Sequence, residues 1–139
     1  MTVTAPTPTG TTARQCAALI GAAPTKIAGQ RSRPISPASR YAAAWGDPAV
    51  VLTCGGAAPK ALAPTSQCFR VDSVDWLVTQ DGAEVDPTKT LRGELDFTTV
   101  GRSAYVRVRV PDAYQPAADA LVDLAATIRG HTTVTKPCR

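Results

Sequence analysis

The sequence is short of aromatic rings, imidazoles and long apolar runs, and each shortage excludes a class of protein. Aromatic residues make up 5% of the 139 residues, so Ala, Val and Leu must fill most of any core. No apolar run approaches the length of about 20 residues that a membrane-spanning helix needs. His131 is the only imidazole and follows a predicted helix end in a Thr-rich tail, so a Ser-His-Asp triad has no well-placed base.

Nucleotide-binding and hydrolase motifs are missing as well. No G-x-S-x-G elbow occurs, and Gly55-Gly56 lacks the Lys-Ser/Thr pair that completes a P-loop. A cysteine nucleophile would need a free thiolate, which disulfide formation removes. We therefore expect no cofactor, no bound metal and no catalytic residues. The sequence favours a domain that is not an enzyme.

Acidic residues are absent before Asp47, which leaves the first 46 residues with five cations. They are Arg14, Lys26, Arg31, Arg33 and Arg40. A basic segment over residues 26–40 could contact phosphates, anionic lipid headgroups or acidic polymers. The alternative is an ordinary solvated face. We favour that alternative and expect no nucleic-acid partner, because aromatic residues are not interleaved with the charges.

Four widely spaced cysteines, Cys16, Cys54, Cys68 and Cys138, indicate the compartment. No pair has C-x-x-C spacing, which argues against a zinc site. Two disulfides in an exported protein account for them most simply. Spacing leaves all three pairings open. No charged and then apolar leader opens the sequence, so we expect an export signal to have been removed, from a protein that is secreted or membrane-anchored on the cell surface.

The chain divides into a tether and one domain. Residues 1–12 are rich in Pro and Thr without apolar periodicity, which predicts a disordered tether. Such a tether could hold the domain away from a membrane anchor, or it could be an ordinary frayed terminus. Residues 13–139 are predicted to form a single α+β domain, and we expect a monomer.

Helices are predicted over residues 13–22, 37–45 and 116–129. The second would begin after the cap-like Ser36-Pro37 and stop at Gly46. In the third, Ala117, Leu121, Leu124 and Ile128 share one face.

Strands are predicted over residues 49–54, 71–79, 94–99 and 105–110. Outward Glu94 and Asp96 should face outward Arg107 and Arg109 across a hairpin. The result is an α+β fold with an antiparallel sheet of about four strands, helices packed on one face and two disulfides.

Five residues form the candidate ligand cluster: Trp45, Asp47, Asp75, Trp76 and Arg102. Glycan hydrolysis needs two carboxylates, which Asp75 could provide with Asp47 or Asp72. Arg102, in a hairpin turn, could grip a carboxylate or phosphate. Structural roles are the competing interpretation, because Asp47 precedes Pro48 in a turn, the tryptophans suit a core, and Arg102 could pair with Asp47 or Asp75.

Several motifs together resemble one family, domain of unknown function 3515, which consists of exported proteins or lipoproteins from mycobacteria and other actinobacteria. The resemblance runs from Cys16 to Ile128. It rests on C-x-x-L (Cys16 to Leu19), A-A-W-G-D-P-A-V-V-L-x-C-G (Ala43 to Gly55), V-D-W (Val74 to Trp76), T-T-V-G-R (Thr98 to Arg102) and Val110-Pro111. It implies export and no particular activity. It also implies the pairing Cys16–Cys54 with Cys68–Cys138, against a rival Cys54–Cys68 with Cys16–Cys138.

Three functions compete on this sequence. The first is a non-enzymatic envelope domain that binds another exported protein or a wall component. The second is a small-ligand or cell-wall glycan module, with or without hydrolysis, that uses Asp47, Asp75 and Arg102. The third is a binder of anionic polymers or lipid headgroups through residues 26–40.

Overall fold

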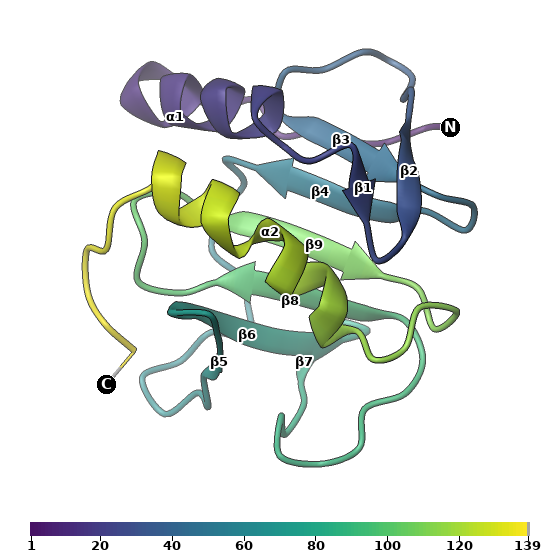
Figure 1. Cartoon of the computed structure of the whole chain (residues 1–139). Helices are drawn as coiled ribbons and strands as arrows, with labels where there is room; N and C mark the ends of the chain where they lie inside the picture. The colour runs from purple at the N-terminus through teal and green to yellow at the C-terminus, as the bar shows by residue number, and fades with distance from the viewer. Residues whose placement is uncertain (139) are drawn as a thin grey trace.

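Both helices lie on the same face of an antiparallel sheet (Figure 1). The computed structural model describes residues 1–138, and residue 139, the last of the predicted domain, lies outside them. Within residues 1–138 there are two helices and nine strands. They are α1 (Gly10–Gly21), β1 (Lys26–Ile27), β2 (Gln30–Arg33), β3 (Ala42–Trp45), β4 (Val50–Cys54), β5 (Phe69–Val71), β6 (Val74–Gln80), β7 (Ala83–Glu84), β8 (Leu95–Thr99), β9 (Val106–Val110) and α2 (Ala118–His131).

The α+β class and the antiparallel sheet are confirmed, but the expected strand count of about four was too low. Across the sheet the order is β1-β2-β3-β4-β9-β8-β6-β5, with β7 paired to β6. The four predicted strands are β4, β6, β8 and β9. The five others have two to four residues each, too few to show an apolar alternation in the sequence.

The predicted helix over residues 37–45 is wrong, because its second half is strand β3. Trp45 pairs with Val50, and Ala42 pairs with Thr53. Gly46, with a φ of 77°, starts the turn that returns the chain into the apolar strand β4. Pairing with that strand outweighs the helix propensity of the alanines, which is a weak local preference. The Trp45 ring is buried, and its Nε1 donates to the Pro24 carbonyl at 2.9 Å.

Helix α2 covers the central strands with the predicted face. Leu121, Leu124 and Ile128 are fully buried, and α2 contacts β5, β6 and β9. On the strand side, Val106, Val108 and Val110 of β9 are buried, as their alternation predicts. The core therefore lies between this helix and one face of the sheet.

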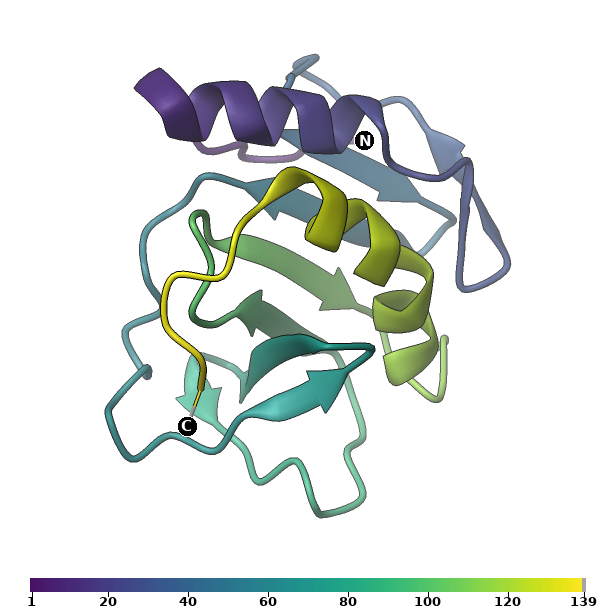
Figure 2. The ribbon, with the colours of Figure 1, turned by 60° about the vertical axis from the view of Figure 1, so that its left-hand side comes forward.

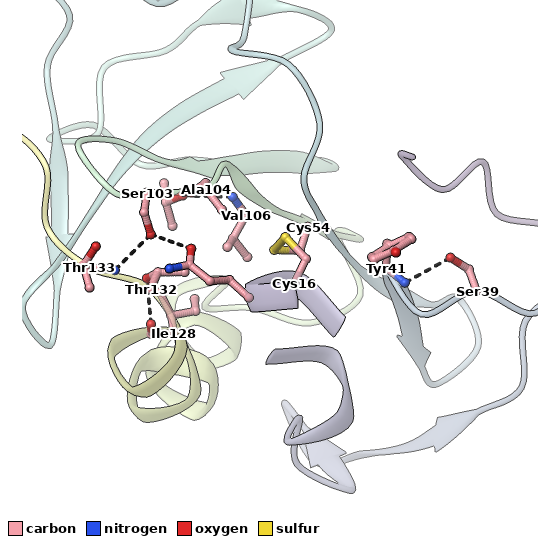
Figure 3. The surroundings of a disulfide bond; sticks show 12 residues. Cys16, Ser39, Tyr41, Cys54, Ser103, Ala104, Val106, Ile128, Thr132 and Thr133 are labelled. Atoms are coloured by element: carbon pink, nitrogen blue, oxygen red, sulfur yellow. Dashed lines mark hydrogen bonds between the residues drawn. A yellow bond between two sulfur atoms is a disulfide. The ribbon is translucent and has the colours of Figure 1, made fainter. Parts of the chain in front are cut away.

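Two disulfides connect the outer segments to the sheet, with the pairing that the family resemblance implies. Cys16 of α1 joins Cys54 of β4, with the two Cα atoms 5.3 Å apart (Figure 3). Cys68, just before β5, joins Cys138, with the Cα atoms 6.4 Å apart. The C-terminal end accordingly lies at the β5 and β6 side of the sheet (Figure 2).

Residues 1–9, which we call the N-terminal segment, lie along the sheet face that carries no helix. Figure 1 shows this segment passing behind β3. Thr2 forms a bridge with Ser36, and the Val3 amide donates to the Ser36 carbonyl at 3.2 Å. Val3 is only 8% exposed. The residues predicted as a disordered tether therefore pack on the domain, and α1 begins at Gly10, ahead of the predicted helix start at Ala13.

Truncation of Leu124 should strongly destabilise the domain. Replacing Leu124 by Ala removes buried methyl groups and leaves a cavity under α2, so we expect the free energy of unfolding to fall by about 2–5 kcal/mol in a urea titration. Val122 of the same helix is 49% exposed, and Val122→Ala should change it by less than about 0.5 kcal/mol. Equal losses in the two variants would contradict the described packing.

Native protein should contain no free thiol. Its intact mass should lie below the reduced mass by four hydrogen atoms, two for each disulfide, and unreduced digests should link Cys16 to Cys54 and Cys68 to Cys138. With sequence separations of 38 and 70 residues, the chain-entropy argument gives roughly 4 kcal/mol of stabilisation from each bond. Four free thiols, or a peptide that joins Cys54 to Cys68, would refute this arrangement.

Candidate binding groove on the helix-free face

The two predicted tryptophans are core residues in this structure. Trp45 is 1% exposed and Trp76 is fully buried. Trp76 packs edge-to-face on Phe97, with the ring centroids 6.5 Å apart, and its buried Nε1 has no hydrogen-bond partner within residues 1–138. Neither ring is at the surface, so neither provides a platform for a sugar.

Asp47 lies apart from Asp75 and Arg102, in the turn between β3 and β4. Its side chain is 91% exposed and lies 3.8 Å from Nη1 of Arg33. The same Arg33 nitrogen donates to the Gly46 carbonyl at 2.9 Å. Asp47 is thus in the turn that its position before Pro48 suggests.

Asp75 and Arg102 do come together, but around a cavity of only about 40 Å³. That volume accommodates about three water molecules by the size of a probe sphere. Asp75 pairs with Arg70, whose Nε donates to Oδ1 at 2.8 Å, and it accepts the Cys138 amide at 3.4 Å. Asp75 therefore holds the C-terminal end beside β5 and β6.

Arg102 also holds the C-terminal end. Its Nη1 donates to the carbonyl of Thr132 at 3.3 Å and to the hydroxyl of the same residue at 3.2 Å. The pKa of Arg102 is lowered, first by burial and then by the nearby positive charge of Arg129. The negative charge of Asp75 opposes this shift only in part. The neighbouring Gly101 carbonyl accepts the amides of Thr135 and Lys136 at 2.8 and 3.2 Å.

The first part of the basic segment forms an outer edge of the sheet. Lys26 in β1 is the register partner of Arg31 in β2, so two like charges lie side by side. Arg33 is engaged at the β3–β4 turn, and Arg40 is exposed before β3. These cations follow one edge of the sheet and do not surround the groove described next.

A wide groove runs over the helix-free face of the sheet, and the sequence did not indicate it. It consists of two adjoining cavities of about 430 and 610 Å³ that share Thr4, Thr53 and Arg107 in their walls. We call the two together the sheet groove. One wall is the N-terminal segment, and another is the loop over residues 56–61. The floor belongs to strands β4, β6, β8 and β9.

Two arginines of β9 are held in the sheet groove by one buried carboxylate. Asp96 Oδ1 accepts Nε of Arg109 at 3.1 Å, and its Oδ2 lies 3.0 Å from Nη2 of Arg107. The Asp96 side chain is 11% exposed, whereas the arginine side chains are about half exposed, at 52% and 47%. The pKa of Arg109 is raised, mainly by its hydrogen bond to Asp96 and further by the negative charges of Asp96 and Glu94. Burial of the guanidinium opposes this rise. The predicted hairpin pairing is therefore confirmed, with Asp96 lying beneath the arginines.

Threonine hydroxyls lie beside the arginines on the floor of the sheet groove. Thr98 is the register partner of Arg107, and Thr79 is the register partner of Asp96. Thr98 is 4% exposed and Thr79 is 7% exposed. Neither hydroxyl bonds to another residue within 1–138, and both residues line the sheet groove. The groove thus offers guanidinium donors and hydroxyls for a ligand's polar groups.

Among the described residues that line the groove there is no His or Cys, and Glu94 is the carboxylate in its wall. Both oxygens of Asp96 are engaged by arginines, and Nδ1 of His131 lies 2.8 Å from the Thr127 carbonyl at the end of α2. Among the described residues, no group of three or more His, Cys, Asp or Glu side chains could hold a metal ion. Neither helix within residues 1–138 has the length and apolarity to cross a membrane.

Comparison with known proteins gives one result. The family model described as a protein of unknown function (DUF3515) matches residues 1–137. The comparisons with curated proteins and with solved structures find no match. The family match includes the N-terminal segment and three of the four cysteines.

Removing the Arg102 side chain should loosen the C-terminal end. We expect Arg102→Ala to speed amide hydrogen exchange of Thr135 and Lys136 about tenfold, because hydrogen bonds that help to position Gly101 beside them are lost. Arg40→Ala removes an exposed guanidinium elsewhere and should leave both rates unchanged. Unchanged exchange in Arg102→Ala would reject the structural role of this arginine.

Proposed function

Because the chain belongs to the DUF3515 family, for which no activity is described, we propose its function from the geometry: a non-enzymatic binding domain that holds a component of the cell envelope in the sheet groove. The single observation behind this proposal is the charged floor of that groove. Asp96 fixes two half-exposed arginines there, beside threonine hydroxyls that have no partner within residues 1–138. Polar groups arranged in advance bind with a smaller entropic cost.

The proposed localisation of the protein is extracytoplasmic, either secreted or anchored on the cell surface. Two disulfides fit an oxidising environment, in which such bonds form and persist. They also stabilise the domain without a cofactor or partner, as an exported binding module requires. The component that it binds would be a polymer of the cell wall.

The two other sites predicted from the sequence are less suitable. The cavity between Asp75 and Arg102, of about 40 Å³, is less than a tenth of the size of either groove cavity, and Asp47 is not in its wall. The basic segment presents an edge in which Lys26 and Arg31 repel each other. Both sites remain distinguishable from the groove by experiment.

Chemical-shift mapping tests the proposal. Muramidase-solubilised cell-wall fragments are added to ¹⁵N-labelled, disulfide-bonded protein, and the backbone amide shifts are followed. We expect the largest changes at Thr53, Thr98 and Arg107, which lie in the groove. Changes confined to residues 26–33 would favour the basic segment, and changes confined to Asp75 and Arg102 would favour the small cavity. Either result would contradict the proposal.

A charge-matched pair of variants separates the groove from net charge. Arg107→Ala with Arg109→Ala removes two cations from the groove, whereas Lys26→Ala with Arg31→Ala removes two from the sheet edge. We expect the groove pair alone to weaken binding of the wall fragments, by at least about tenfold, because charge-assisted hydrogen bonds are lost. An equal loss in both pairs would show attraction by overall charge.

A further inference from the structure

The two groove arginines keep unused donors. Arg107 and Arg109 each donate Nε to Asp96 Oδ1, and Nη2 of Arg107 forms an ion pair with Oδ2. Nη1 of Arg107 and both terminal nitrogens of Arg109 have no hydrogen-bond partner within residues 1–138. A guanidinium with two free terminal nitrogens can bind a carboxylate or phosphate through paired hydrogen bonds. These unpaired donors therefore favour a ligand that carries an anionic group.

The local charge balance limits how acidic the ligand can be. Lys60, Arg107 and Arg109 line the groove, against Glu94 in its wall and Asp96 beneath the arginines. Three cations against two carboxylates leave one positive charge. This balance fits a ligand with one or a few acidic groups better than a densely charged polymer.

Hydroxyls without protein partners indicate what surrounds the acidic group. Thr98 and Thr79 are more than nine-tenths buried and line the same cavity as Thr53. Neither hydroxyl is fully enclosed, so both open onto the groove, where they can donate to and accept from the hydroxyls of a ligand. Tyr105 adds a half-buried ring to this wall.

The strands of the floor exclude one common mode of peptide binding. β4, β8 and β9 each have a paired strand on both sides, so none has a free edge to which an extended peptide could add. The apolar lining of the groove is mostly Ala, Pro and Val, small side chains that give the anchor residue of a peptide little large apolar surface to pack against. A saccharide needs neither feature.

We propose that the sheet groove binds an acidic saccharide. Its carboxylate or phosphate is bound by the free donors of Arg107 and Arg109, and its hydroxyls meet Thr53, Thr79 and Thr98. Asp96 is a positioning residue, which orients both arginines without touching the ligand. This inference rests on the function proposed above and assigns the chemical class of its ligand.

Four probes test the ligand class on native, ¹⁵N-labelled protein. Trigalacturonate carries carboxylates on a trisaccharide, glucose 6-phosphate carries a phosphate, maltotriose is neutral, and triglutamate is a peptide with the same number of side-chain carboxylates as trigalacturonate. We expect trigalacturonate, glucose 6-phosphate or both to bind at least about tenfold more tightly than maltotriose and triglutamate. Whichever of the two acidic sugars binds more tightly identifies the acidic group as a carboxylate or a phosphate.

Two variants test the contacts for whichever acidic sugar binds. Thr98→Val keeps the side-chain shape but removes the hydroxyl, and should weaken binding about threefold, whereas Thr133→Val at the exposed C-terminal end should have no effect. Arg109→Ala should weaken binding about tenfold. Thermal unfolding of each variant verifies that it is folded. If Arg109→Ala is not folded, Thr98→Val still tests the site.

Several results would overturn the ligand class. They are equal binding of triglutamate and trigalacturonate, equal effects of Thr98→Val and Thr133→Val, and no binding of either acidic sugar. If wall fragments still shift the groove amides in these cases, the saccharide inference fails and the proposed function stands. If wall fragments leave those amides unmoved, both fail.

Discussion

The two-residue period of strand β9 is the constraint on which the rest of the structure depends. Val106, Val108 and Val110 point under α2 and complete the core, while Arg107 and Arg109 between them must point to the opposite face. A shift of register by one residue would bury guanidinium groups and expose valines, so the core fixes the direction of the arginines. Burial on one face thereby sets the chemistry of the other.

Asp96 offsets the electrostatic cost of that arrangement. It is the register partner of Arg109, and its two oxygens also serve Arg107 on the next outward position of β9. Without it, two neighbouring guanidinium groups would repel each other on a partly desolvated surface. The carboxylate therefore stabilises the β8–β9 hairpin and also orients the arginine donors of the sheet groove.

Local patterns predicted the centre of the fold well. The alternation in residues 94–99 and 105–110 predicted the β8–β9 hairpin, and the shared face of Leu121, Leu124 and Ile128 predicted α2. Strand β3 was predicted as helix, because its alanines carry a helix preference and only the partner strand reveals the pairing. The sheet groove could not be predicted, because Thr4 and Arg107 are about a hundred residues apart and meet only after folding.

Because the N-terminal segment is a wall of the proposed binding groove, ligand binding there would be coupled to the order of this segment. Its backbone is tied to the domain near Ser36, and Pro8 fits against Gly55, where φ is 102° and a Cβ would overlap the proline ring. A ligand that contacts Thr4 gains affinity only while this wall is in place. By thermodynamic reciprocity, the same ligand must then favour the docked state of the wall by an equal free energy. Residues 1–9, whose composition is that of a linker, would thus share in setting the dissociation constant.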